Sequence, residues 1–118
     1  MSVQTTREAL AKALKNYKYN VYSHPSEVMI APAAVIVPGS PYVSIKGNNF
    51  YTVYFQVTLM VTNNNNQAAL IQLERMIDEL IDHAPAWISI GDFSQPTTLE
   101  IGSTEYLTTD LTIELQEV

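Results

Sequence analysis

The clearest pattern in the chain is a period of two between Phe50 and Thr62, in which every second residue is apolar and the residues between them are mixed. A period of two predicts a β-strand, and this run is longer than the average strand of about 5–6 residues. Residues 63–66 are four asparagines, which predict a polar turn that also caps a following helix. One face of the strand is wholly apolar and consists of Tyr51, Val53, Phe55, Val57, Leu59 and Val61.

Two segments carry the apolar spacing of an amphipathic helix. The first is expected over residues 6–16, where Thr5 and Glu8 have the spacing of a capping box. The second is expected over residues 67–83 and ends before Pro85. The expected inward faces are Leu10, Ala13, Leu14 and Tyr17 for the first helix, and Ala69, Leu70, Leu73, Met76, Ile77, Leu80, Ile81 and Ala84 for the second.

Shorter strands are expected at residues 17–23, 88–90, 98–101 and 106–116, with a tight turn at 102–103 that makes a terminal hairpin. No repeat or linker divides the chain, so we expect a single domain over residues 1–118. The fold class is predicted to be α+β, with a mixed or antiparallel sheet and two main helices packed on it. The last strand is expected to turn Leu107, Thr109, Leu111, Ile113 and Leu115 inward.

The segment between residues 25 and 49 carries four prolines and two glycines. Prolines keep a segment off the central positions of a sheet, so edge strands or a projecting arm or hairpin are expected here. Residues 33–37 are five apolar residues in a row, and they must be covered. Two covers remain open, namely the domain's own helix and a neighbouring subunit.

Composition narrows the classes of function. The chain has 118 residues, of which 47% are apolar and 15% charged, and it has no Cys. The absence of Cys excludes disulfides, thiolate nucleophiles and Cys-ligated zinc. The net charge of −6 argues against a general binder of polyanions. The apolar runs are too short to span a bilayer, and the N-terminus lacks the features of a signal peptide, so we expect synthesis in the cytoplasm and no membrane partner.

The charges are distributed unevenly along the chain. Residues 1–62 carry five cations and two anions, whereas residues 63–118 carry one cation and ten anions. Opposite charges on two sides of a subunit suit head-to-tail self-association. Glu74, Asp78 and Asp82 follow one another at i+4 steps on the second helix, beside the outward-pointing Ile71. A solvated acidic face and a docking surface both remain open for this helix.

Candidate chemistry is sparse. Known catalytic and nucleotide-binding motifs are absent, and the two histidines, His24 and His83, do not favour a Ser–His–Asp site. The best metal candidate is Asp78 and Asp82 with Glu74 or His83, but a hard cation needs about six oxygens from converging elements. The sequence therefore predicts no catalytic residue, no cofactor and no metal site.

Three segments carry a resemblance that covers nearly the whole chain. They are the opening Thr-Thr-Arg-Glu-Ala-Leu helix, the run 50–62 that leads through the asparagines into the helix to Asp82, and the closing Thr-Leu-Glu-Ile-Gly-Ser-Thr-Glu-Tyr-Leu at 98–107 with the Thr-rich strand to Gln116. In order and size, these elements resemble the tail terminator and head–tail joining proteins of long-tailed bacteriophages.

The resemblance implies a structural subunit of the virion, located at the junction of tail and head. Such subunits form a ring, usually a hexamer, that caps the tail tube and offers a surface to the head-completion or connector protein. DNA passes through the lumen without specific recognition. Residues 28–43 and the acidic helix face are then expected at subunit contacts, with two lysines of a neighbour opposite the acids. The candidate interface residues are Val28, Ile30, Val35, Ile36, Val37, Tyr42, Ile71, Glu74, Asp78, Asp82, Lys12 and Lys15.

Two other classes of function stay open. One is a small ligand-binding or enzyme-like α+β domain with a pocket between sheet and helix. The other is a nucleic-acid-binding module, in which Tyr17, Tyr19 and Tyr22 would stack on bases. Both helices can also lie on one side of the sheet with their charges in solvent, in which case the acidic face needs no partner.

Overall fold

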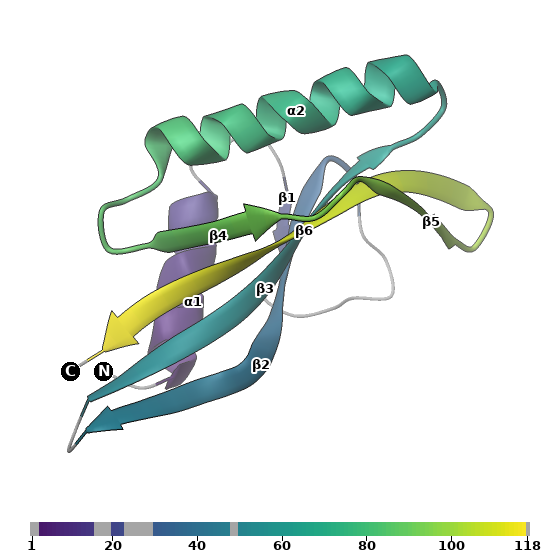
Figure 1. Cartoon of the computed structure of the whole chain (residues 1–118). Helices are drawn as coiled ribbons and strands as arrows, with labels where there is room; N and C mark the ends of the chain where they lie inside the picture. Colours follow the sequence, from purple (N-terminus) through teal and green to yellow (C-terminus); the bar gives the residue numbers. More distant parts are fainter. Residues whose placement is uncertain (1–2, 16–19, 23–29, 48–49, 118) are drawn as a thin grey trace.

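The computed structural model describes residues 3–15, 20–22, 30–47 and 50–117. Two helices and six strands follow one another in the order shown in Figure 1. The elements are α1 (Val3–Leu14), β1 (Asn20–Tyr22), β2 (Ala33–Gly47), β3 (Phe50–Thr62), α2 (Asn66–His83), β4 (Ser89–Phe93), β5 (Thr97–Ile101) and β6 (Thr104–Glu117).

The strands form one sheet in the order β1-β2-β3-β6-β4, and β5 also pairs with β6. β3 and β6 are the central strands, and they pair in antiparallel register from Tyr51↔Glu117 to Thr62↔Tyr106. β5 lies along the first half of β6 and β4 along the second half, on the same side. β1 pairs with β2 in parallel, whereas the other pairs are antiparallel. The predicted α+β domain with a mixed sheet is therefore confirmed.

Both helices pack on the same face of this sheet. α1 lies against β1 and β2, and α2 lies against β3 and β6. Their buried side chains share one core with the alternate residues of the strands below them. The expected inward face of β3 is confirmed from Val53 to Val61. The fully or almost fully buried members of this core include Leu10, Leu14, Ile36, Phe55, Leu59, Leu73, Leu80, Leu111 and Ile113.

The apolar run at residues 33–37 is buried on both faces of the sheet. Ala34 and Ile36 point toward the helices and belong to the main core. Ala33 and Val35 point to the opposite face, where they form a second cluster with Met60. A strand that is covered on both sides carries a continuous apolar run without any partner protein. The sequence left open whether the same chain or a neighbouring subunit buries this run. In the structure, residues of the same chain bury it.

α1 begins before its expected start at residue 6, and it ends at Leu14. Thr5 lies inside this helix, so the capping box expected from Thr5 and Glu8 is wrong, because a cap must precede the first helical residue. Gln4 instead donates a hydrogen bond of 3.2 Å to the Glu8 carboxylate, one turn away. Of the expected inward face, Leu10 and Leu14 are buried, Ala13 is half-buried, and Tyr17 lies outside the described residues.

α2 begins where the asparagine run predicts. Asn65 has extended backbone angles (φ −149°, ψ 118°), and its side chain is the N-cap. The Asn65 Oδ1 accepts hydrogen bonds from the backbone N–H groups of Gln67 at 3.0 Å and Ala68 at 3.1 Å. Two of the four N–H groups that a helix start leaves unpaired are satisfied in this way.

We expect Asn65→Ala to lower the free energy of unfolding by about 1 kcal/mol, because both of these N–H groups lose their acceptor. For a domain of this size the melting temperature should fall by about 4 °C. Thermal unfolding followed by circular dichroism measures the change. Asn64→Ala is the matched control, since Asn64 is exposed and precedes the cap; an equal loss from both variants would contradict the capping role.

The inward face of α2 is narrower than its sequence suggests. Ala69, Leu73, Met76 and Leu80 form the buried stripe. Leu70 and Ile81 are exposed, so their prediction as inward residues is wrong. Successive helical residues are rotated by roughly 100°, so these two side chains fall on one flank of the helix, beside the buried stripe. Ile77 on the same flank and Ala84 after the helix are half-buried.

β2 and β3 form a long hairpin that extends beyond the ends of both helices at the lower left of Figure 1. β1 pairs with β2 only at residues 33–35, so Pro38 and Pro41 lie where that edge of β2 has no β1 partner. The register shifts between Pro38 and Val43, and Gly39 lies so close to β3 that an added Cβ would come within 2.8 Å of Tyr54. Beyond residue 35 no described strand pairs with the outer edge of β2, so this segment forms an edge strand, which is one of the forms expected for it.

Candidate functional site

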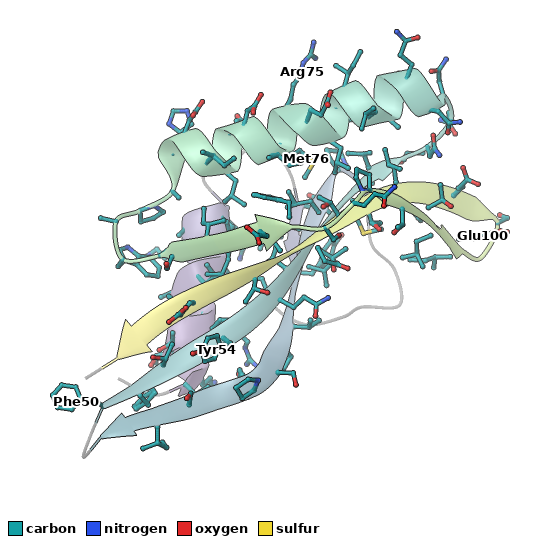
Figure 2. All side chains as sticks on the ribbon, in the orientation of Figure 1. Phe50, Tyr54, Arg75, Met76 and Glu100 are labelled. Atoms are coloured by element: carbon teal, nitrogen blue, oxygen red, sulfur yellow. The ribbon has the colours of Figure 1, made fainter. Side chains whose placement is uncertain are left out.

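Among the exposed apolar side chains of the described residues, two groups lie at different places on the subunit. The first is the hairpin tip, which we define as Ile45 and Phe50. The Ile45 side chain is 74% exposed and the Phe50 side chain 45% exposed. Figure 2 shows Phe50 at the far end of the β2–β3 hairpin, pointing away from the domain. These side chains lie past the helices, so the core of the same chain does not bury them.

The second group surrounds a groove at the C-terminal end of α2. α2 ends at His83, its C-cap Ala84 has an extended backbone, and Pro85 follows. The Ile88 N–H donates a hydrogen bond of 3.1 Å to the Pro85 carbonyl, and this turn brings the chain back along β4. The resulting α2–β4 groove has a volume of about 570 Å³ and is lined by Ile81, Ala84, Pro85, Ala86, Ile88, Ile90, Gly91 and Phe93.

The residues that line the α2–β4 groove have no polar side chain. A small-molecule site combines an apolar wall with a few convergent polar groups that orient the ligand. The polar groups near this groove, such as Asp82 and Asp92, are exposed and do not line it. Ile81 is 55% exposed at its edge, and Trp87 in the adjoining turn is also exposed. This composition suits an apolar protein side chain better than a polar metabolite.

β4, which forms one wall of the groove, is an edge strand. It pairs with β6, and no described strand pairs with its other edge. Its register shifts between Ile90 and Phe93, and a Cβ added at Gly91 would lie 3.1 Å from the Thr112 carbonyl oxygen. An open strand edge exposes backbone N–H and C=O groups to any extended chain beside it.

The outward face of α2 is acidic, as the sequence predicts. Glu74, Asp78 and Asp82 are exposed, and Ile71 is exposed beside them. Figure 2 shows Arg75 on the side of the helix away from the sheet. Within the described residues, no group of three or more His, Cys, Asp or Glu side chains is placed to hold a metal ion. The carboxylates that the sequence offered as the best metal candidate, Glu74, Asp78 and Asp82, all come from one helix, α2.

The opposite face of the sheet is polar at its centre. Gln56 and Thr112 are exposed there, and the Thr58 hydroxyl donates a hydrogen bond to the Asp110 carboxylate across the β3–β6 pair. The Thr108 hydroxyl donates to the backbone carbonyl of Thr97 at 3.3 Å. Hydroxyl, amide and carboxylate groups thus cover much of the face that carries neither helix.

The structure distributes the predicted interface residues over several surfaces instead of one. Val35 and Ile36 are buried inside the folded subunit, so they are not available to a neighbour, and their prediction as contact residues is corrected. Tyr42 packs its ring edge-on against Phe55 at 5.7 Å and 75°, and Val37 is also half-buried. Val28 lies outside the described residues. The other predicted interface residues are exposed, namely Ile30, Ile71, Glu74, Asp78, Asp82, Lys12 and Lys15.

The sequence pattern did not predict that Ile45, Phe50, Ile81 and Trp87 are exposed. One available signal was the position of Ile45 and Phe50 near the ends of two consecutive strands, β2 and β3. Another was the width of the predicted inward face of α2, which is broader than one sheet can bury.

No family model matches this chain, and no curated protein does. Neither described helix is long and apolar enough to cross a membrane.

Proposed function

We propose that this chain is a structural subunit of the tail terminator or head–tail joining class of long-tailed bacteriophages. In this proposal copies of the chain form a ring, with six as the expected number, that caps the tail tube and binds the head-completion or connector protein. DNA passes through the ring without specific recognition. The subunit is made in the host cytoplasm, acts in the virion at the tail–head junction, and needs neither cofactor nor catalytic residues.

The observation that carries the proposal is the projecting β2–β3 hairpin with its exposed apolar tip. β2 and β3 extend past the helices, with β6 paired to β3 as far as Tyr51, and they leave Ile45 and Phe50 exposed at their end. An extension of this kind gains stability when another protein covers it. The order of the elements on which the resemblance rests also supports the proposal. These elements form one sheet with two helices on a single face.

The surface chemistry also supports a ring around DNA. The chain has a net charge of −6, and the open face of the sheet carries Gln56, Thr58, Asp110 and Thr112 at its centre. A lumen lined by neutral and acidic groups does not hold phosphates, because affinity for DNA rests on clustered cations. Such a lining would let DNA pass through the ring without being held.

The direct test is the mass of the purified chain in solution. Size-exclusion chromatography with light scattering over a concentration series should give a species close to six times the 13.2 kDa of one chain, and negative-stain images should show rings. The genes beside this one should encode tail tube, tape-measure and head-completion proteins. A strict monomer or dimer at all concentrations, together with unrelated neighbouring genes, would contradict the proposal.

A further inference from the structure

We propose that the α2–β4 groove binds an extended segment of a partner protein, which adds as a strand to the open edge of β4. The segment carries apolar side chains at alternate positions, which enter the groove, and Lys or Arg residues on either side of them. The site belongs to a single subunit and lies beyond the proposed self-association, so either can fail without the other.

The host surface combines the two features that an extended apolar segment needs. The groove offers Ile81 from α2 together with Ile90 and Phe93 from β4, and no polar side chain lines it. No described strand pairs with the outer edge of β4, which forms one wall of the groove. In strand addition the backbone of an edge strand binds the incoming chain, while pockets beside it take alternate side chains. The groove is placed to be such a pocket.

The charges around the groove favour a basic segment. Residues 66–93, which form α2, β4 and the turn between them, carry five acids and one arginine. Asp82 and Asp92 are exposed, and each adjoins a residue that lines the groove. Glu114 of the neighbouring strand β6 pairs with the first residue of β4 and is exposed as well. Opposite charges beside an apolar contact steer the encounter, and like charges exclude acidic partners.

The described strands with a free edge do not supply such a segment from a second copy. β2 is free beyond its pairing with β1, but this part carries Pro38 and Pro41, and a proline has no N–H group to donate. β1 has three residues, and β5 carries Glu100 and no cation. A second β4 would bring the acids of two copies together.

The first helix does not supply the segment either. Lys12 and Lys15 of α1 are exposed, so this helix has the required charge. Its apolar side chains Leu10 and Leu14 are buried in the core of their own subunit and are not available to a groove. Charge and free strand edges therefore favour a partner protein over a second copy.

The single Trp of the chain lies where it can report binding. Trp87 is 49% exposed between Ala86 and Ile88, which both line the groove. The probe is the peptide Lys-Lys-Val-Thr-Val-Thr-Val-Lys-Lys, which has no aromatic residue and whose five central residues match the five residues of β4. Its valines share one face, because alternate residues of a strand point the same way. Titration of the whole chain with this peptide should give a saturable change in Trp87 fluorescence.

Three altered peptides test the chemistry of the occupant. The first has glutamates in place of its lysines, and the second has serines in place of its valines. The third carries methyl groups on the backbone nitrogens of its central residues and so lacks their N–H donors. Each should bind about tenfold more weakly or worse, because it loses the charge attraction, the apolar contact or the strand pairing. Equal affinity of any of the three would overturn the part of the proposal that it tests.

Two variants of the chain test the place of binding. Ile81 lines the groove, whereas Ile71 lies on the outward face of the same helix, and both are exposed, so both serine variants should fold. We expect Ile81→Ser to weaken binding of the probe by about tenfold, because an apolar contact is lost. Ile71→Ser is the matched control and should keep the affinity of the original chain. Equal affinities of the two variants would place the peptide outside the groove.

Two further outcomes would overturn the site as a whole. The first is a probe that produces no saturable change in Trp87 fluorescence. The second is a Trp87 signal that changes with the concentration of the chain alone, since a second copy would then occupy the groove. Light scattering separates these failures from failure of the ring. A ring that does not bind the probe leaves the proposed function, and a monomer that binds it leaves the site.

Discussion

Ile36→Asp is expected to unfold the subunit. The Ile36 side chain is 0% exposed and belongs to the core shared by α1, α2 and the sheet. A carboxylate at this place would lie in an apolar environment without a partner, and it would also leave part of the volume of isoleucine unfilled. We expect the free energy of unfolding to fall by about 4 kcal/mol or more, which is a large share of the roughly 5–15 kcal/mol that stabilises a typical domain.

Urea unfolding followed by circular dichroism measures this loss. Ile45→Asp makes the same chemical change on the same strand, at a side chain that is 74% exposed. Its free energy of unfolding should stay within about 0.5 kcal/mol of the original chain. An Ile36→Asp variant that unfolds at the original urea concentration would place Ile36 outside the core and restore the apolar run at 33–37 as a contact surface.

The comparison of these two isoleucines shows why an apolar run does not by itself identify an interface. Residues 33–37 are covered by their own chain because alternate side chains enter two separate clusters. Ile45 stands among polar and small residues in the sequence, but the hairpin carries it beyond the core. A run of apolar residues in the sequence therefore indicated the buried segment. The exposure of Ile45 was not predictable in this way, because it depends on how far the sheet extends past the helices.

Local sequence patterns predicted the strands and helices that bury one face against the core. The alternation at 50–62 gave β3 with its observed bounds, and the asparagine run gave the cap of α2 at Asn65. Both predictions depend on neighbours in sequence, which fix strand period and helix start. For the same reason the pattern predicted that Ile71, Glu74, Asp78 and Asp82 of α2 face outward, as they do.

Pairing between distant segments was beyond the sequence pattern. The parallel pairing of β1 with β2, and the sharing of one side of β6 by β4 and β5, depend on contacts far apart in sequence. The exposed flank of α2 has the same origin, because Leu70 and Ile81 would be buried if the sheet extended farther beneath them. The α2–β4 groove follows from this limited width, and so its lining was not predicted.

Phe55→Ala is the second change for which we expect a large effect. Phe55 is the largest fully buried side chain of the chain's described core. It lies in the middle of β3, opposite Pro38 of β2 and Ile113 of β6. Truncation removes its buried ring and leaves a cavity that a sheet held on both sides cannot fill. We expect a loss of about 3–5 kcal/mol in the free energy of unfolding.

Phe50→Ala is the matched control, since Phe50 begins the same strand and its side chain is 45% exposed. Its expected loss of stability is within about 0.5 kcal/mol. Urea unfolding of both variants gives the two values on one scale. A loss of similar size from both would contradict the picture of a hairpin whose base is core and whose tip is surface.

The edge-on contact of Tyr42 with Phe55 gives the prediction a second, independent measurement. The two ring centres are 5.7 Å apart with an interplanar angle of 75°. A double-mutant cycle with Tyr42→Ala should give a coupling free energy of about 0.5–1.5 kcal/mol, because either single change removes the same contact. Additive losses would mean that Tyr42 is held by the hairpin and not by Phe55, and its half-buried side chain would then be free to contribute to a subunit contact.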